Sequence, residues 1–587
     1  MKNIKVSKSL NCKISKSINP TLKNLNNINR FRFIVLLLIT STFCTFPVNG
    51  QWVKVGYNHQ GISESIAGNV SLAFSNEGIP FVAFTDDYLN AGNLAVMKFN
   101  GSSWVKVGYN HQGISEGIVN NVSLAFDNGG TPFVAFTDDY LNAGNLAFMK
   151  FNGSSWVKVG YNHQGISEGI ANNVSLAFDN GGTPFVAFTD DYLNAGNLAV
   201  MKFNGSSWVK VGYNHQGISE GIVNNVSLAF DNGGTPFVAF TDDYLNAGNL
   251  AFMKFNGSSW VKVGYSHQGI SEGIANNVSL AFDNGGTPFV AFTDDYLNAG
   301  NLAVMKFNGS SWVKVGYNHQ GISEGIVNNV SLAFDNGGTP FVAFTDDYLN
   351  AGNLAVMKFN GSSWVKVGYN HQGISESIAG NVSLAFSNEG NPFVAFTDDY
   401  LNAGNLAVKK FNYNYLDLRW RLQAMFPVPD TLSVQLRNSI YPYEVVDSAK
   451  VFAELSSTNF RKTIRFKNII TGNSYYIVAK HRTSIETWSA YPVEFLSDTT
   501  FYNFTTSLNK AYGNNMISIN GIASFYSGDV NQDHTIDAGD VSIVDNASAI
   551  GLSGNVPEDL NGDGFVDASD LSIVDENAYN VISAVTP

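Results

Sequence analysis

The sequence predicts a mainly β protein with a seven-bladed β-propeller, a β-sandwich and a small α-helical calcium-binding domain. Three observations lead to this prediction. A unit of 52 residues recurs seven times between Trp52 and Asn412, a strand-rich segment without repeats follows, and two acidic loops lie near the C-terminus. Repeats of this length with four strand-like runs each are typical of propeller blades rather than of helical repeats.

The first 50 residues predict a secretory signal peptide. A basic segment without acidic residues precedes an apolar run at residues 33–39 and small residues at 48–50. We therefore expect residues 1–50 to be removed and the protein to be extracellular, either released or held at the cell surface. Both cysteines, Cys12 and Cys44, lie in this segment, so the mature chain would contain no disulfide.

The remaining chain is acidic. After residue 50 it has 26 basic and 48 acidic residues, a formal net charge of −22. This charge argues against nucleic acid or an anionic membrane surface as a partner. Nothing after the leader resembles a transmembrane segment.

Each repeat predicts four antiparallel strands, A to D, written NVSLAF, TPFVAFT, NLAVMKF and WVKVG in the sequence. The runs are short, rich in Val, Phe and Leu, and separated by Gly, Asn and Asp. Several are apolar on both faces, as expected for sheets sandwiched between neighbours. The chain enters at strand D and leaves after strand C, so we expect the N-terminal strand to complete the seventh blade of a propeller spanning residues 51–412.

The candidate binding residues of the propeller lie in two long polar loops. Connections alternate between the ends of an up-and-down sheet, so the D–A loop and the B–C loop share one rim. Long polar loops on a rigid scaffold commonly carry binding residues. In the first repeat these are His59, Glu64, Asp86, Asp87 and Tyr88, and each recurs every 52 residues, for example as His111, Glu116, Asp138, Asp139 and Tyr140.

Each of these residues has a structural alternative. Asp86 would cap the B–C turn through backbone amides, or bind calcium together with Asp87, Asn90 and Asn93. His59 would hold the D–A loop by a hydrogen bond, and Tyr88 would either pack between blades or stack on a sugar ring. An acid–base set of His59, Glu64 and Asp86 is disfavoured, because catalytic sites combine groups in dissimilar environments and identical blades repeat the same environment.

Residues 413–526 predict an immunoglobulin-like β-sandwich. Several runs alternate apolar and polar residues with period two. The stretch SYYIVAKHRTSIETWSAYPVEF resembles a module that precedes the C-terminus of many secreted bacterial proteins. We expect its polar and aromatic residues, His481, Arg482, Glu486 and Trp488, to serve pairing and packing.

Residues 527–587 carry the strongest chemical motif. Oxygen ligands stand at positions 1, 3, 5, 9 and 12 of two loops, with a backbone carbonyl at position 7, which is the pattern of calcium loops. The segment has 12 acidic residues and no Lys or Arg. We therefore expect two Ca²⁺ ions with folding coupled to binding, held by Asp529, Asn531, Asp533, Thr535, Asp537 and Asp540 in the first loop and by Asp559, Asn561, Asp563, Phe565, Asp567 and Asp570 in the second.

This paired-loop pattern resembles the type I dockerin domain. The resemblance implies calcium binding and, as in cellulosomes, attachment to a cohesin-like or cell-surface protein. Two features depart from the family. His534 replaces the glycine at position 6 of the first loop, and Ala538-Gly539 and Ala568-Ser569 stand at positions 10 and 11, which carry cohesin recognition in familiar dockerins. Calcium binding therefore carries over better than cohesin binding.

The first functional hypothesis is a secreted, non-enzymatic binding or adhesion protein. Its multivalent propeller would bind a glycan, and the dockerin-like domain would dock it to a partner. The alternative is a dockerin-bearing hydrolase or accessory subunit of polysaccharide degradation. A carboxylate pair from dissimilar loops at glycosidase spacing would favour the alternative. A third hypothesis is a propeller that serves as a spacer without a ligand.

Overall fold

The computed structural model describes most of the chain after residue 50. Residues 1–50, on which the signal-peptide prediction falls, lie outside the described residues. The described part is 51–587 without residues 90–91, 110–111, 143, 163, 195, 215, 247, 266–267, 299, 319, 351, 370–371, 403, 425–429, 457–458, 467–468, 470–472 and 496–498.

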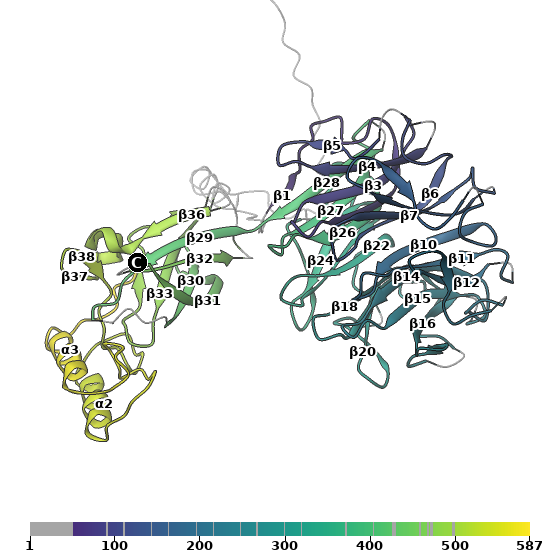
Figure 1. Ribbon diagram of the computed structural model, residues 1–587. Helices are drawn as coiled ribbons and strands as arrows, with labels where there is room; N and C mark the ends of the chain where they lie inside the picture. Colours follow the sequence, from purple (N-terminus) through teal and green to yellow (C-terminus); the bar gives the residue numbers. More distant parts are fainter. Residues whose placement is uncertain are drawn as a thin grey trace, which may run out of the picture. The chain divides into compact units, whose positions relative to one another are not determined.

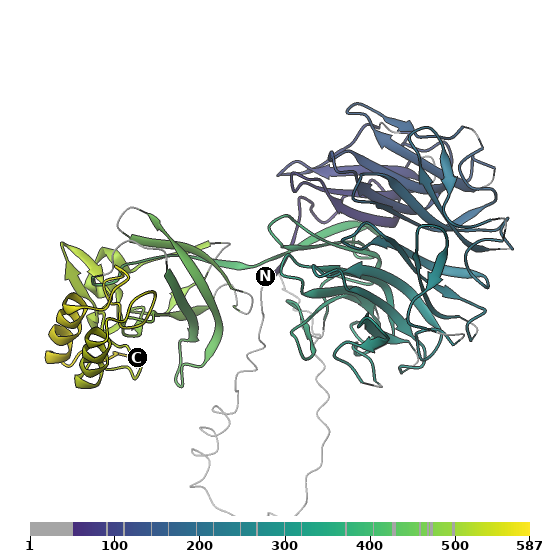
Figure 2. The same cartoon turned by 60° about the horizontal axis from the view of Figure 1, so that its bottom comes forward.

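Residues 51–412 form seven four-stranded antiparallel sheets, which are the blades of a propeller (Figures 1 and 2). The first full blade contains β2 (Ala67–Phe74), β3 (Pro80–Asp86), β4 (Asn93–Phe99) and β5 (Trp104–Lys106). The next five blades are β6 (Val119–Phe126), β7 (Pro132–Asp138), β8 (Asn145–Phe151), β9 (Trp156–Lys158); β10 (Ala171–Phe178), β11 (Pro184–Asp190), β12 (Asn197–Phe203), β13 (Trp208–Lys210); β14 (Val223–Phe230), β15 (Pro236–Asp242), β16 (Asn249–Phe255), β17 (Trp260–Lys262); β18 (Ala275–Phe282), β19 (Pro288–Asp294), β20 (Asn301–Phe307), β21 (Trp312–Lys314); and β22 (Val327–Phe334), β23 (Pro340–Asp346), β24 (Asn353–Phe359), β25 (Trp364–Lys366).

The seventh blade is completed by the N-terminal strand. It contains β26 (Ala379–Phe386), β27 (Pro392–Asp398), β28 (Asn405–Asn412) and β1 (Gln51–Lys54). Strand β1 pairs antiparallel with β28, with Trp52 opposite Phe411. The indole of Trp52 donates a hydrogen bond to the carbonyl of Val367 at 2.7 Å. The predicted closure and the predicted seven blades are confirmed.

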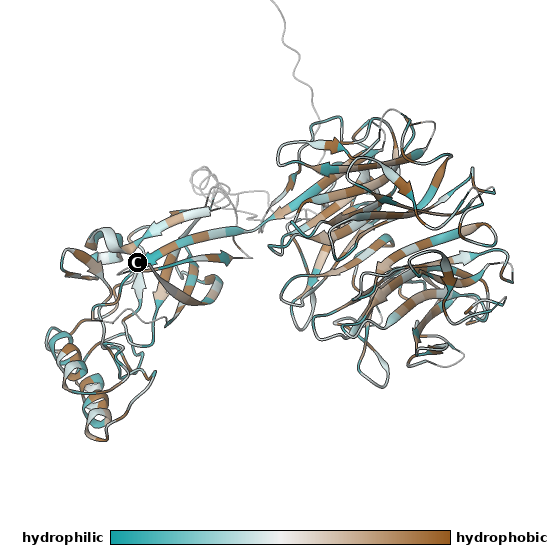
Figure 3. Cartoon of the chain, viewed as in Figure 1, coloured by the Kyte–Doolittle hydropathy of each residue, from teal (hydrophilic) through white to brown (hydrophobic). Residues whose placement is uncertain are grey.

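The blades are buried on both faces. Every residue of β3 is buried, and Val82 and Phe84 are completely inaccessible. One apolar cluster joins Phe81 and Val96 of the first full blade to Val134 and Phe136 of the next. Figure 3 shows apolar stretches along the strands of the blades. Burial between two neighbours is the physical reason why these strands are apolar on both faces.

Three closed rings of hydrogen bonds join the seven blades. In the first ring, the backbone amide of Asn121 donates to Oδ1 of Asn69 at 3.0 Å. The ring closes where the backbone amide of Asn69 donates to Oδ1 of Asn381, also at 3.0 Å. A second ring runs through the serine hydroxyls equivalent to Ser71. A third, in the A–B turns, runs from Asn76 through Asn388 and back. Each asparagine of the first ring has a left-handed φ near that of Asn69, 48°, which asparagine tolerates better than most residues.

The segment after the propeller forms one eight-stranded sheet around a single core, and we refer to it as the sandwich. Its strands are β29 (Asn414–Trp420), β30 (Asp430–Asn438), β31 (Val445–Ser456), β32 (Asn459–Phe466), β33 (Ser474–Lys480), β34 (Thr487–Trp488), β35 (Val493–Glu494) and β36 (Thr499–Asn503). The long β31 pairs with β30 along its first part and with β32 at its end, so it belongs to both halves. Short elements follow, η1 (Phe504–Thr506), η2 (Leu508–Lys510), η3 (Tyr512–Asn514), β37 (Ile517–Ile519) and β38 (Ile522–Ser524).

The C-terminal domain contains two helices, α2 (Ala538–Ala549) and α3 (Ala568–Tyr579). Val544 and Val574 are fully inaccessible and share a core with Ile536 and Leu560. Asp537 and Asp567 cap the two helices, each in a capping box. In the part of the chain that the structure describes, no helix has the length and apolar character needed to cross a membrane.

Candidate functional site

The carboxylate of Asp86 stabilises the loops of the propeller rim. It accepts hydrogen bonds from the backbone amides of Glu64 at 2.9 Å, Ser65 at 3.1 Å and Tyr88 at 3.1 Å. Burial raises the pKa of Asp86 above its ordinary value, although the backbone amides act in the opposite direction. The side chain is 2% exposed, so Asp86 caps the turn and joins the D–A loop to the B–C loop.

The neighbouring aspartate acts in the same way. Asp139, the equivalent of Asp87 in the next blade, accepts a hydrogen bond from the amide of Ile118 at 2.7 Å. The same contact recurs between Asp191 and Ile170 at 2.6 Å. These carboxylates are engaged by backbone amides, which favours the structural alternative over a calcium site in the rim loops.

Glu64 is paired with a lysine that the sequence analysis did not single out. Its carboxylate lies 2.8 Å from the ammonium of Lys106, and the equivalent pair closes the ring between Lys54 and Glu376 at 2.5 Å. The ammonium of Lys106 also lies 5.5 Å from the ring centroid of Tyr109. The lysine of WVKVG recurs with the same 52-residue period as Glu64, so the period is a signal that could have indicated the pair.

The tyrosines of the B–C loops are the most exposed aromatic side chains of the rim. Tyr88 is 61% exposed, and its equivalents are similarly exposed, namely Tyr140, Tyr192, Tyr244, Tyr296, Tyr348 and Tyr400. His59 is also exposed, whereas its equivalents in the other six repeats lie outside the described residues. The rim therefore presents one accessible aromatic ring per blade.

Blade seven differs from the other six at one buried position. Lys409 stands where the equivalent residue is methionine, as in Met97 and Met357. It is 7% exposed, and its ammonium donates a hydrogen bond to the carbonyl of Ile374 at 2.7 Å. Burial lowers the pKa of Lys409, although Glu376 and Asp398 act against this shift.

The first acidic loop of the C-terminal domain brings three carboxylates together. Asp529, Asp533 and Asp540 each offer an oxygen, and these oxygens lie within 4.8 Å of one another. Burial, and then the charges of Asp540 and Asp533, raise the pKa of Asp529 to about 6. Three carboxylates in a segment without Lys or Arg would be neutralised by a cation, and hard oxygen donors fit Ca²⁺.

The other predicted ligands lie in the same two loops. In the first loop, Asn531 donates to Asp533, and Asp540 accepts from the amides of Val530 and Asn531. The second loop repeats this arrangement with Asn561, Asp563 and Asp570. Asp559 accepts from the amides of Gly562 and Gly564. Thr535 and Phe565 follow at the positions expected to offer backbone carbonyls, and Asp537 and Asp567 cap the helices.

The polar residues of the sandwich pair as expected. Arg482 and His481 contact the carboxylate of Asp430 at 3.0 Å and 3.1 Å. The buried Glu486 accepts a hydrogen bond from the indole of Trp488. Glu486 also faces His534 of the first acidic loop, a contact between domains that no local sequence pattern predicts.

Comparisons with known proteins agree with the C-terminal assignment. The family model of the Dockerin type I domain matches residues 527–578. The C-terminal domain is therefore dockerin-like, as the paired loops predicted, and dockerin domains bind calcium and cohesins. A search of curated proteins gives no match.

Three solved structures similar to the chain are enzymes. They are the polysaccharide lyase Uly1 (9% identity, 62% of this chain and 97% of that chain, TM-score 0.38), the GH93 α-L-arabinofuranosidase of Fusarium graminearum (10%, 62% and 97%, TM-score 0.35) and the NanB sialidase from Streptococcus pneumoniae (12%, 64% and 72%, TM-score 0.32). These likenesses assign no role to any residue of this chain.

The expectation of a non-enzymatic protein is corrected by this finding, because these similar structures are those of enzymes. The expectation rested on seven equal blades. The blades are nearly but not fully equal, since Lys409 stands in blade seven where the other six have methionine.

Proposed function

We propose that the chain is a secreted component of polysaccharide degradation, a dockerin-bearing hydrolase or accessory subunit. The match of residues 527–578 to the dockerin family carries this proposal, because dockerins attach proteins to assemblies that break down polysaccharides. The proposed division is a leader at 1–50, a propeller at 51–412, a sandwich at 413–526 and a dockerin-like domain at 527–587.

The dockerin-like domain would hold two Ca²⁺ ions, one in each acidic loop. Asp529, Asp533 and Asp540 would provide the carboxylates of the first site, and Asp559, Asp563 and Asp570 those of the second. Calcium would neutralise these carboxylates and fix both loops against their helices. The docked partner would be a cohesin-like or cell-surface protein that recognises small residues at loop positions 10 and 11.

The propeller would contact the polymer through its tyrosine rim. A tyrosine ring presents an apolar face and a polar tip, which suits a sugar ring. The exposure of Tyr88 and its six equivalents supports this role. Seven weak, equivalent contacts on a rigid ring would strengthen binding to a repeating chain through effective concentration.

A panel of soluble and insoluble polysaccharides tests the proposal. The mature protein is incubated with each polymer in calcium, and both retention on the polymer and released reducing ends or unsaturated products are measured. We expect retention on at least one polymer, and release of products if the chain is itself the hydrolase. Absence of retention and of products across the panel would contradict a role in polysaccharide degradation.

A variant pair tests the rim. Replacing Tyr140, Tyr192 and Tyr244 by alanine should weaken retention at least tenfold, because stacking on three adjacent blades is lost. The matched control replaces Ser154, Ser206 and Ser258 by alanine in the turns at the opposite rim, where retention should not change. Equal retention by both variants would exclude the tyrosine rim as the polymer surface.

A further inference from the structure

The two acidic loops differ at the positions where the backbone turns. The second loop has Gly562 and Gly564 with φ of 74° and 89°. The first loop has Gln532 and His534 with φ of 59° and 76°. Side chains other than glycine pay a steric cost in this left-handed region. The backbone of the first loop therefore has a steric cost that the second loop avoids. We expect other contacts of Gln532 and His534 to offset this cost.

Gln532 finds its partners in the sandwich and in its own loop. Its Nε2 donates to the carbonyl of Asp529 at 2.6 Å and lies 3.3 Å from the carbonyl of His481 and 3.4 Å from that of Ser484. The carbonyls of His481 and Ser484 follow strand β33. The side-chain amide of Gln532 therefore joins this sandwich turn to Asp529, the first ligand position of the loop.

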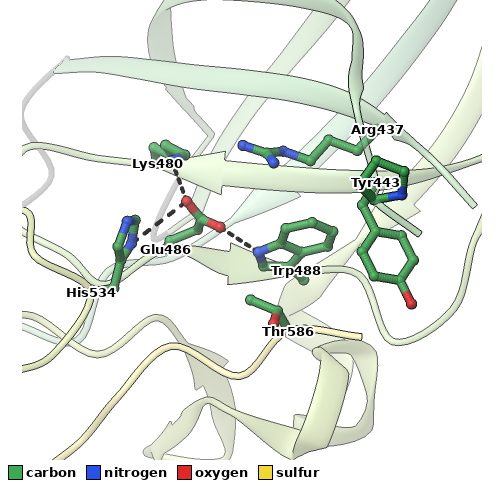
Figure 4. Close-up of a pocket in the computed structure, with 8 residues that line it drawn as sticks. Arg437, Tyr443, Lys480, Glu486, Trp488, His534 and Thr586 are labelled. Atoms are coloured by element: carbon green, nitrogen blue, oxygen red, sulfur yellow. Dashed lines mark hydrogen bonds and ion pairs between the residues drawn. The ribbon is translucent and has the colours of Figure 1, made fainter. Parts of the chain in front are cut away.

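His534 faces a buried carboxylate of the sandwich. Its Nδ1 lies 3.8 Å from Oε2 of Glu486, which is 7% exposed (Figure 4). The same carboxylate pairs with Lys480 and accepts from the indole of Trp488. These residues line a cleft of about 280 Å³, together with Arg437 and Tyr443. Trp488 donates to Oε1 of Glu486, whereas Lys480 and His534 both face Oε2, so one carboxylate oxygen is shared between the sandwich and the loop.

Backbone contacts fasten the start of the first loop to the same turn. The amide of Gly528 donates to the carbonyl of Thr483 at 2.7 Å, and the amide of Ile485 donates to the carbonyl of Tyr526 at 3.1 Å. Ile485 is fully inaccessible within the core of the helical domain. The second loop is contacted differently: Arg482 of the turn donates to the carbonyl of Val556, ahead of the ligand positions. Within the described residues, no side chain from 559 to 570 forms a hydrogen bond to the sandwich.

We propose that the sandwich turn at residues 481–486 positions the first calcium loop through Gln532 and His534. The first site then depends on the sandwich, whereas the second depends on its own glycines. This inference rests on the calcium binding proposed above. By linkage, an ion in the first loop stabilises the sandwich as much as the sandwich strengthens binding of the ion.

Calcium titration by calorimetry on the full mature chain tests this inference. Asp559→Ala with Asp563→Ala disables the second loop, and Asp529→Ala with Asp533→Ala disables the first, so each site is read separately. With the first loop intact, Glu486→Gln and Gln532→Ala should each weaken calcium binding roughly threefold to tenfold, the range of one hydrogen bond or ion pair. With only the second loop intact, each should change the affinity by less than about twofold.

Two further variants separate contact from backbone strain. Gln532→Gly removes the same contact but relieves the backbone, so its loss of affinity should be smaller than that of Gln532→Ala. In a His534→Gly background, Glu486→Gln should have less effect than in the parent chain, because its partner is already absent. Circular dichroism confirms that each variant is folded.

The outcomes are distinguishable. If neither background binds calcium, the proposed calcium function fails. If both loops bind calcium and Glu486→Gln and Gln532→Ala affect neither loop, or both loops equally, the positioning role of the sandwich is wrong while calcium binding stands.

Discussion

The propeller and the dockerin-like domain are both built from internal repeats, but only the propeller keeps its repeats nearly equal. Every blade lies between two blades, and rings of hydrogen bonds such as that through Asn69 continue through all seven. The two calcium loops have unequal surroundings, since the first faces Glu486 and the second does not. The nearly equal repeats therefore have equal neighbours, and the two loops with different sequences have different neighbours.

Blade seven carries a buried residue that the other six lack. Lys409 lies in β28, the strand that pairs with the N-terminal β1 instead of with a strand that follows it in sequence. The buried lysine thus lies at the closure of the ring, whereas Phe148 and Phe252, which replace the valine of the other blades, lie in internal blades. The predictions below either disturb the equal part or change the unequal part, beginning with the largest effect.

Removal of calcium should give the largest difference in stability between the propeller and the dockerin-like domain. With chelator, the acidic loops repel themselves and the dockerin-like domain should lose its helices, whereas the propeller, whose blades need no ion in our interpretation, should keep its strands. Limited proteolysis with and without chelator measures this, with cleavage expected first within residues 527–587. Equal protection of that segment in chelator would contradict coupled folding and binding.

Much of this contrast could be predicted from the sequence, because it depends on local patterns. The 52-residue period predicted the blades and their closure, and ligand spacing predicted the loops from Asp529 and Asp559. The role of Asp86 as a turn cap was among the alternatives. The contacts of Glu486 with His534 could not be predicted, because they join residues 48 positions apart from two different domains. His534 was visible as a departure, but its partner was not.

Loss of a tryptophan should cost the closing blade more than an internal blade. Trp52 and Trp104 make the same indole hydrogen bond, to Val367 and Val55, both at 2.7 Å. Each change to alanine should lower the free energy of unfolding by about 3–5 kcal/mol. Trp52→Ala should in addition release β1, since only noncovalent contacts hold that strand at the closure. Denaturant unfolding measures the first effect, and protease cleavage near residue 51 the second; identical cleavage of both variants would contradict the special role of β1.

Replacing Lys409 by the methionine of the other six blades should stabilise the propeller. Lys409→Met gives blade seven the methionine of the other six and removes a buried ammonium, which should raise the free energy of unfolding by about 2 kcal/mol. Burial lowers the pKa of Lys409, so the parent chain should gain stability as the pH rises from the folded pKa towards 10.5, where the unfolded chain still binds the proton. The variant should lose this pH dependence. Met357→Lys is the matched reverse change and should destabilise; a stability loss in Lys409→Met would show that its bond to Ile374 outweighs the cost of burial.

The smallest effect should come from Asp430, which holds the residues that begin the sandwich turn. Burial alone would raise its pKa, but the hydrogen bond and charge of His481, together with Arg482, lower the pKa of Asp430 from 3.8 to about 2. Its contribution is therefore complete above pH 3.8 and is lost as the pH falls towards 2, because the unfolded chain takes up the proton first. Asp430→Asn should remove about 1 kcal/mol near neutral pH, allowing for partial screening by solvent. Comparing unfolding of parent and variant from pH 5 to pH 2 cancels the titration of the calcium loops, and a difference that stays constant over this range would contradict the assignment. Because Asp430 anchors His481 and Gln532 lies against the carbonyl of His481, the same variant should also weaken calcium binding at the first loop.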